Sequence, residues 1–287
     1  METIRAFQSL ASPFWDGLVL WLTNLGSERA YIVFLIIAYV GVSSKFGQRL
    51  AVVLLSSFYL NQQIKMFFAT PRPFELEPEI ARSEEAIVTA IGPGFPSGHA
   101  QAGASFWFLA ALYTRKAWFW ALALLLILAL GLSRIYLGVH FPIDVYGGYL
   151  IGLLLALTAF WVFKELEHFS TPPAWLVIFL TLLVLLILQY AFPTADSSLL
   201  LGALAGFIIG PRLIKHHLSK QVWKRVLLTL IAVVLGFGVL TASSLFLPES
   251  IKRDPLCGFL RYLVISLVIT WFIPYLGRIS GLAEQEA

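Results

Sequence analysis

The chain has 287 residues, of which 59% are hydrophobic and 13% are charged, whereas soluble domains carry about 25% charged residues. This composition excludes an ordinary soluble domain and indicates an integral membrane protein. The formal net charge of +4 fits basic residues on cytoplasmic loops, so we expect no nucleic-acid partner. The single cysteine, Cys257, excludes an internal disulfide framework and a metal cluster built on cysteines.

The N-terminal segment is predicted to lie on the membrane surface. Residues 3–26 carry apolar side chains at helical spacing, among them Phe7, Leu10 and Leu18, which is typical of an amphipathic interfacial helix. Pro13 is the place where such a helix would bend. A short first transmembrane span is the alternative interpretation.

The remainder of the chain alternates apolar runs with polar loops. Backbone groups must pair internally in lipid, and the sequence lacks the alternation of a closed barrel, so each span is expected to be helical. A span needs about 20 mainly apolar residues. We therefore predict an all-α fold, a polytopic membrane helix bundle with about nine transmembrane helices. They are expected at 30–46, 50–69, 99–114, 117–136, 143–163, 174–192, 198–214, 226–247 and 259–278.

Loop charges orient this bundle. With the loop after the first span inside, eleven of the twenty Lys and Arg residues lie inside, and the basic loop 212–225 is the strongest anchor. This orientation gathers three polar clusters on the outer face. We expect a multi-pass protein of a bacterial inner membrane with a site that faces the periplasm.

The first polar cluster closes the second predicted span. Lys65 lies one or two turns before the end of that span, and Pro71 and Pro73 terminate the helix on either side of Arg72. The two cations could converge on one anion just outside the bilayer. Alternatively, they snorkel to lipid headgroups, as basic residues at span ends usually do.

The second cluster opens the third predicted span. Ser97 is a good N-cap residue, Gly98 lets a ligand approach the backbone, and His99 could give or take a proton. The free amides at such a helix start form an anion site. An ordinary capped helix after a Gly/Pro loop is the alternative.

The third cluster joins the fourth span to the fifth. It places Arg134, His140 and Asp144 near bilayer depth, where charges are costly and mark function by default. Asp144 follows His140 by four residues, so the two would face each other on one turn if the chain is helical there. Such an aspartate makes a histidine a usable nucleophile or base. The alternative is an interfacial histidine and arginine among lipid headgroups.

The combined clusters suit phosphoryl chemistry. Three cations can balance the negative charge of a phosphate monoester, and the cations and free amides can donate hydrogen bonds to its oxygens. Phosphoryl transfer also needs an in-line nucleophile and a proton donor for the leaving oxygen. His140 with Asp144 fits the nucleophile, and His99 fits the acid. The cations supply the electrostatic stabilisation, so we expect no metal.

These three clusters resemble the signature motifs of the type 2 phosphatidic acid phosphatase superfamily, the lipid phosphate phosphatases. The motifs are complete, in order and correctly spaced within a region of about 50 to 163, and they also resemble glucose-6-phosphatase locally. They read Lys65-x6-Arg72-Pro73, Pro96-Ser97-Gly98-His99 and Ser133-Arg134-x5-His140-x3-Asp144.

The resemblance implies a phosphohistidine intermediate and no cofactor. His140 would attack phosphorus, Asp144 would orient its ring, and His99 would protonate the leaving oxygen. The residues that would hold the phosphoryl group are Lys65, Arg72, Ser97, Gly98 and Arg134.

The resemblance leaves the substrate open. Undecaprenyl diphosphate, phosphatidate, phosphatidylglycerol phosphate and a sphingoid-base phosphate are the lipid candidates, with membrane lipids as the other expected partners. A phosphatase of a soluble sugar phosphate, a lipid phosphotransferase, and a transporter or lipid binder without chemistry are the alternatives. The oligomeric state stays open.

We expect three regions along the chain. An interfacial helix occupies 1–28, and the phosphatase core with its outward-facing site occupies 29–168. The membrane helices of 169–287 carry no candidate chemistry. Gly202, Gly206 and Gly210 in this last region indicate close helix packing, within the chain or between subunits.

The loop 74–92 carries five glutamates and one arginine. Near a phosphate site such a loop could act as a lid, or it could discriminate among headgroups by repulsion. The simpler interpretation is a solvated loop.

Overall fold

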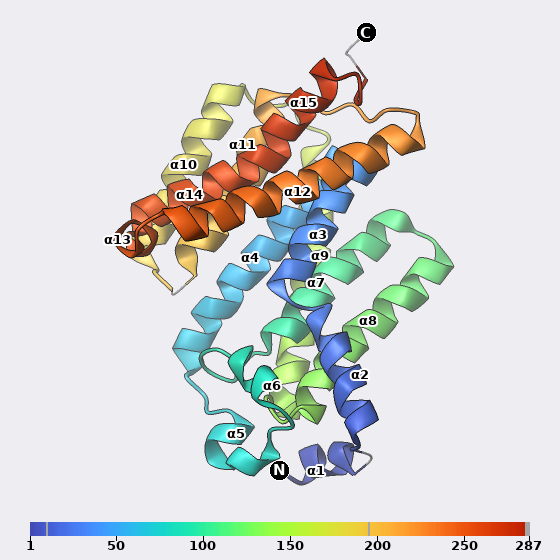
Figure 1. Ribbon diagram of the computed structural model, residues 1–287, viewed down its shortest axis with the longest axis vertical. Helices are drawn as coiled ribbons and strands as arrows, with labels where there is room; N and C mark the ends of the chain where they lie inside the picture. The colour runs from blue at the N-terminus through green and yellow to red at the C-terminus, as the bar shows by residue number, and fades with distance from the viewer. Residues whose placement is uncertain (10, 195, 285–287) are drawn as a thin grey trace. The chain divides into compact units, whose positions relative to one another are not determined.

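The computed structural model describes residues 1–9, 11–194 and 196–284; Leu10, part of the predicted interfacial helix, lies outside them. Among these residues the regular elements are all helices (Figure 1), so the all-α class is confirmed. In chain order they are α1 (Glu2–Gln8), α2 (Pro13–Asn24), α3 (Glu28–Ile36), η1 (Ile37–Val42), α4 (Ser44–Phe68), α5 (Pro73–Leu76), η2 (Pro78–Ile80), α6 (Glu84–Val88), α7 (Gly98–Thr114), α8 (Ala117–Tyr136), α9 (Pro142–Leu166), α10 (Ala174–Ala191), α11 (Ser197–Leu213), α12 (Val222–Phe246), α13 (Glu249–Arg253), α14 (Pro255–Leu267), η3 (Val268–Phe272) and α15 (Ile273–Ile279).

Five helices are long and apolar enough to cross a membrane, namely α8, α9, α10, α12 and the continuous Pro255–Ile279. A sixth span results if the bent pair Pro13–Asn24 and Glu28–Val42 counts as one. The described residues therefore give five to six candidate spans and do not support nine. Two of the other predicted spans, α7 and α11, have only 17 residues each. The helix α4 is long enough but carries polar side chains such as Asn61 and Lys65.

The N-terminal segment forms two helices, so one helix over 3–26 is wrong. The helix α1 ends at Gln8, and α2 begins at Pro13, whose fixed φ suits the first helical position. Ser12 caps α2, because its hydroxyl accepts a hydrogen bond from the Trp15 N–H (3.4 Å). The proline therefore starts a helix rather than bending one.

The chain forms two compact units, which we describe separately. The first unit comprises Met1–Tyr31 and Leu60–Leu166, and the second comprises Ile32–Tyr59 and Glu167–Ala287. All three polar clusters belong to the first unit.

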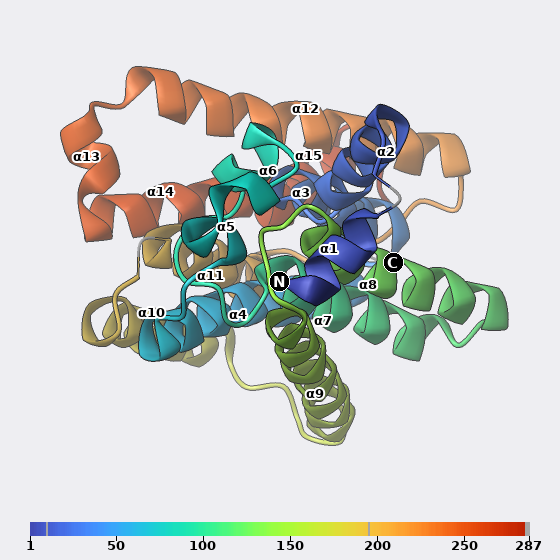
Figure 2. The same cartoon turned by 90° about the horizontal axis from the view of Figure 1, so that it is seen from below.

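Helices α7 and α9 pack closely in the first unit (Figure 2). A Cβ added at Gly152 would lie 2.4 Å from the Gln101 carbonyl oxygen, and one at Gly148 would lie 2.7 Å from the Ser97 oxygen. Only glycine allows this approach. As a result the starts of the two helices meet, and the Ser97 N–H donates to the Asp144 carbonyl (2.9 Å).

In the second unit, the small residues of α11 face α14 and η3. A Cβ at Gly206 would lie 1.9 Å from Ser266 Oγ, and one at Gly210 would lie 2.0 Å from Thr270 Oγ1. The small-residue stripe therefore packs against another helix of the same chain, which is the first of the two expected arrangements.

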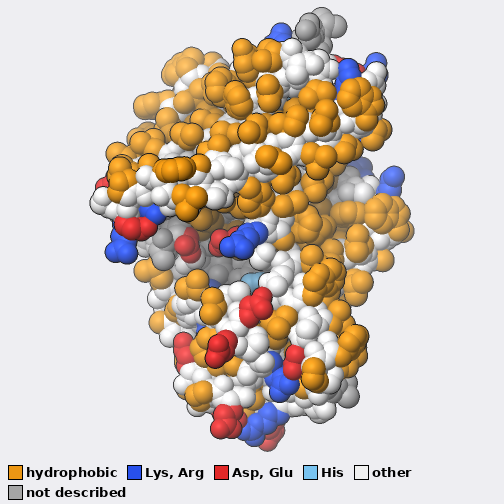
Figure 3. Space-filling view, in the orientation of Figure 1, with side chains coloured by type: hydrophobic (Ala, Val, Ile, Leu, Met, Phe, Trp, Pro, Cys, Tyr) orange, Lys and Arg blue, Asp and Glu red, His pale blue; other side chains and the backbone are white. Residues whose placement is uncertain are grey.

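The surface agrees with a membrane environment. Figure 3 shows hydrophobic side chains over much of the visible face, α12 included, while charged side chains gather over α1, α5 and α6 and again over α13. Val234 on α12 is 70% exposed and Leu125 on α8 is 64% exposed. Apolar surface of this extent marks an interface rather than a face in water. The protein is a multi-pass integral membrane protein.

Candidate active site

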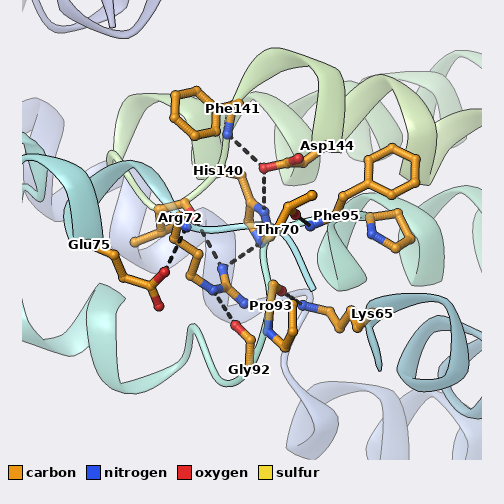
Figure 4. A network of polar contacts seen from close by, with 12 residues as sticks. Lys65, Thr70, Arg72, Glu75, Gly92, Pro93, Phe95, His140, Phe141 and Asp144 are labelled. Carbon is orange, nitrogen blue, oxygen red and sulfur yellow. Dashed lines mark hydrogen bonds and ion pairs between the residues drawn. The ribbon is translucent and has the colours of Figure 1, made fainter. Parts of the chain in front are cut away.

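The polar clusters meet in the first unit. Figure 4 shows the Arg72 guanidinium beside the His140 ring, with Asp144 on another edge of that ring. Ser97 joins this group through its backbone bond to Asp144. The side chains are buried, since Arg72, Arg134, His140 and Asp144 are each at most 2% exposed. Buried charges of this kind require partners or a function.

Carbonyl groups hold the Arg72 guanidinium in place. Its Nε donates to Gly92 (2.7 Å), one terminal nitrogen donates to Ile91 (2.9 Å), and the other donates to Val139 (3.0 Å). This last nitrogen also lies 3.0 Å from His140 Nε2. Burial lowers the pKa of Arg72 to about 10, so the group stays charged at neutral pH. An anion that reaches Nε2 must therefore meet the Arg72 charge.

The partners of His140 define its tautomer. Arginine has no acceptor, so Nε2 must present its lone pair to Arg72. The proton then sits on Nδ1, which faces Asp144 Oδ2 at 3.3 Å. This is the tautomer that a nucleophilic Nε2 requires.

The Asp144 carboxylate is placed by the start of α9. The helix begins at Pro142, so His140 precedes the helix and the two residues do not share a helical turn. Asp144 instead reaches back from the first turn, and its Oδ2 accepts from the Phe141 N–H (2.9 Å). This backward reach resembles half of a capping box and brings the same oxygen to the ring.

Two buried polar atoms of the site lack partners within the described residues, namely Ser97 Oγ and Arg134 Nε. Ser97 occupies the N-cap position of α7, as expected, but its hydroxyl makes no capping bond. Unsatisfied buried groups of this kind cost about 1–3 kcal/mol each. A phosphoryl oxygen is a ligand that would satisfy both.

Lys65, Gly98 and His99 complete the predicted set. Lys65 is 7% exposed, and its Nζ donates to the Pro93 carbonyl. Gly98 opens α7, where a Cβ would lie 3.3 Å from Asn61 Oδ1. His99 follows as a half-buried residue whose ring has no hydrogen-bond partner among the described residues.

The acidic loop is tied to the N-terminal helices. Glu77 pairs with Arg5, and Glu85 accepts from the Asn24 amide (3.3 Å). Two further bonds join Arg82 to Asp16 (3.2 and 2.7 Å). The loop is therefore anchored to α1 and α2, and part of its charge is neutralised there.

Sequence reasoning missed two residues that arrange the loop before α7. Asn61 is 5% exposed, and its amide donates to the Pro96 carbonyl (3.2 Å). Thr70 Oγ1 accepts from the Phe95 N–H (2.8 Å). Asn61 lies one turn before Lys65, so a polar residue on the lysine face of an apolar helix was an available signal. Thr70 carries no such signal.

Within the described residues, no group of three or more His, Cys, Asp or Glu side chains could hold a metal ion. Metal independence stays a prediction, tested below.

The surroundings of His140 predict the pH dependence of activity. Burial, and then the cations Arg72, Arg134 and Lys65, hold the pKa of His140 well below its ordinary 6.5. A lowered pKa keeps the ring neutral, and thus nucleophilic, as the pH falls through 6.5. In a plot of kcat/KM against pH, we expect the loss of activity caused by protonation of His140 to occur below pH 6.5. The ionisation of the substrate is measured separately. Loss of activity from this cause at or above pH 6.5 would contradict the assignment.

Two family models match most of the chain. Residues 46–168 match the PAP2 superfamily, and residues 194–285 match the transmembrane extension of PAP2 superfamily phosphatases. The chain belongs to the PAP2 superfamily. The first match contains every residue of the candidate site, and the second covers α11 to α15, part of the C-terminal region to which the sequence assigned no chemistry.

This PAP2 chain is similar to curated proteins from distant organisms. It is 35% identical to the bacitracin transport permease protein BcrC of Bacillus licheniformis over 53% of this chain and 65% of that one. It is 29% identical to human sphingosine-1-phosphate phosphatase 2 over 69% of this chain and 52% of that one. The matches thus span between half and two thirds of these relatives.

A solved structure shares the fold of this PAP2 chain. The crystal structure of a PAP2-type phosphatidylglycerolphosphate phosphatase from Bacillus subtilis superposes with a TM-score of 0.50 at 23% identity. The match covers 58% of this chain and 85% of that one.

Proposed function

We propose that the protein hydrolyses a phosphate monoester or diphosphate of a membrane lipid through a phosphohistidine at His140. One observation carries this proposal: His140 Nε2 faces Arg72 at 3.0 Å while Nδ1 faces Asp144 at 3.3 Å. A ring held in this way keeps Nε2 unprotonated, with its lone pair directed at a fixed cation. A lipid-binding protein without chemistry would need the cation but not the oriented nucleophile.

The reaction runs in two in-line steps. First, His140 Nε2 attacks phosphorus, the N–P bond forms, and the bond to the leaving oxygen breaks as His99 donates a proton to that oxygen. Water then attacks the phosphohistidine with His99 as the base, which breaks the N–P bond and releases inorganic phosphate. Asp144 stabilises the imidazolium in between.

Cations and unpaired donors hold the phosphoryl group. Arg72 and Lys65 exchange carbonyl partners for phosphoryl oxygens, and Arg134 Nε and Ser97 Oγ donate to phosphoryl oxygens and so gain the acceptor that each lacks. The backbone at Gly98 adds a helix-start amide. These charge-assisted bonds strengthen as charge develops on the oxygens.

Apolar surface beside the site supports a lipid leaving group. Met66, Phe67 and Phe68 follow Lys65 directly and are 59%, 83% and 52% exposed. Phe68 also contacts Phe95 at 5.0 Å between ring centroids. The human relative is a sphingosine-1-phosphate phosphatase, which agrees with a lipid substrate. Undecaprenyl diphosphate, phosphatidate, phosphatidylglycerol phosphate and sphingoid-base phosphates are the candidates.

The membrane arrangement forms part of the proposal. We place the site at the periplasmic face of a bacterial inner membrane, because the loop 212–225 carries five basic residues and fits the cytoplasmic side. Short or polar helices such as α7, α11 and α4 would complete a nine-span bundle within this arrangement. The division into an interfacial region 1–28, a core 29–168 and helices 169–287 is kept as a proposal.

Phosphate release from a panel of substrates tests the function. The purified protein is assayed in detergent with the four lipid classes and with a soluble sugar phosphate, each with and without EDTA. We expect release from at least one lipid, little from the sugar phosphate, and no loss with EDTA. Release only from the sugar phosphate would favour the soluble-substrate alternative, and loss with EDTA would contradict metal independence.

A further inference from the structure

We infer that helix α2 and the turn after it position two side chains of the active site, Arg134 through Thr23 and His99 through Gly26. This inference rests on the proposed function, because it concerns residues that act on the phosphoryl group only if the chain is a phosphatase. None of the three sequence motifs includes Thr23 or Gly26.

Two threonine hydroxyls clamp Arg134. Thr23 is 3% exposed, and its Oγ1 accepts from one terminal nitrogen of the guanidinium (3.1 Å), while Thr89 Oγ1 accepts from the other (3.2 Å). Thr89 in turn donates its own proton to the Ala86 carbonyl (2.9 Å), which directs its lone pair to the arginine. The clamp fixes the plane of the guanidinium and leaves Nε without a partner.

This arrangement matters because arginine is a directional ligand. Its donors lie in one plane and form a rigid fork that matches the oxygens of a phosphate. An unclamped Arg134 would keep its charge but lose this fixed direction, and a misplacement of about 1 Å can cost 10²-fold in rate. Thr23 and Thr89 are therefore positioning residues.

The turn after α2 makes room for His99. A Cβ added at Gly26 would lie 2.8 Å from His99 Cδ2 and 3.0 Å from Leu130 Cδ2. Contacts that short force one group to move. The absence of a side chain at Gly26 therefore sets how close the His99 ring lies to the α2 turn.

Polar bonds fix α2 against the rest of the first unit. The Asp16 carboxylate accepts from the Tyr136 hydroxyl (2.7 Å) and from Arg82 (2.7 Å). Tyr136 is the last residue of α8, two positions after Arg134. The helix that carries Thr23 is thus anchored beside the arginine it holds.

A crossed pair of substitutions separates the Thr23 hydroxyl from its packing. Thr23→Val keeps the shape of the side chain and removes the hydroxyl. Thr23→Ser keeps the hydroxyl and removes the methyl group. We expect Thr23→Val to lower kcat/KM by about tenfold and to weaken competitive inhibition by inorganic phosphate similarly, because a bond to a charged group is lost. Thr23→Ser should stay within about threefold of the parent protein.

Thr114→Val is the matched control, because the Thr114 hydroxyl bonds only to the Ala110 carbonyl of its own helix. It should leave both constants unchanged, and all three variants should remain folded at the assay temperature, with Thr23→Val lowering the melting temperature by only a few degrees. Two results would overturn the proposal that the Thr23 hydroxyl positions Arg134. One is a Thr23→Val protein with the same kcat/KM and phosphate inhibition as Thr114→Val. The other is a Thr23→Ser protein whose kcat/KM is as low as that of Thr23→Val.

Gly26→Ala tests the second contact. We expect kcat to fall about tenfold or more while inhibition by inorganic phosphate changes little, because His99 acts on the leaving oxygen. Gly17→Ala is the control, since a Cβ at Gly17 meets nothing within 4 Å. Equal kcat values in the Gly26→Ala and Gly17→Ala proteins would overturn the proposal that Gly26 positions His99.

The parent protein and His140→Ala are assayed in parallel. No phosphate release by the parent from any substrate would reject the proposed function, and with it this inference. An active parent, an inactive His140→Ala protein and unaffected Thr23 and Gly26 variants would reject the inference alone.

Discussion

Replacing His140 with alanine is expected to abolish phosphate release from every substrate, by about 10⁴-fold or more, because the other described partners of the Arg72 guanidinium are backbone carbonyls, which are not nucleophiles. Expression and membrane insertion should be retained. The assay is initial-rate phosphate release at saturating substrate, with the melting temperature in detergent as the measure of folding.

His168→Ala is the matched control for this change. His168 is exposed, lies after the end of α9 and belongs to none of the three motifs. It should release phosphate at the parental rate. A His140→Ala protein that is folded and retains more than about a hundredth of the parental rate would reject the phosphohistidine mechanism.

Asp144→Asn has the second largest expected effect. Asparagine preserves the size of the side chain and can still accept from the Phe141 N–H, so the start of α9 should remain intact. It no longer favours a proton on Nδ1 or stabilises the imidazolium, and we expect kcat to fall by about 10³- to 10⁴-fold. Inhibition by inorganic phosphate should change much less, because the cations remain.

Asp254→Asn controls for the chemical change itself. Asp254 caps α14 in the second unit by accepting from the Cys257 N–H (2.8 Å), and asparagine caps a helix equally well. The control should be fully active. If Asp144→Asn is also active to within tenfold, Asp144 does not orient the nucleophile.

Much of the fold could be predicted because hydropathy marks long apolar helices sharply. The expected span 117–136 coincides with α8, and the expected 174–192 differs from α10 by one residue, since charged or proline-rich segments bound both runs. The expected span 50–69 stays a prediction at α4, because a helix that carries Asn61 and Lys65 along its length is more polar than the candidate spans. At Pro13 the sequence predicted a bend within one helix, whereas the structure has two helices, the second of which begins at that proline.

The candidate site was predictable only where its residues lie in short sequence motifs of fixed spacing. The intervals between Arg134, His140 and Asp144 are short, so local chain geometry brings them together. Contacts over long intervals leave no such pattern: Thr23 reaches Arg134 across 111 positions through a single uncharged hydroxyl. The carbonyls that hold Arg72 belong to backbone, which every residue has, and are therefore invisible in a sequence.

The central claim is that phosphorus becomes bonded to His140, and trapping that bond tests it most directly. The active protein is mixed with substrate labelled with ³²P, quenched in alkali, where phosphohistidine survives, and digested for peptide mapping. We predict label on the peptide that contains His140, lost in acid and absent from His140→Ala. Label on any other side chain would contradict the account.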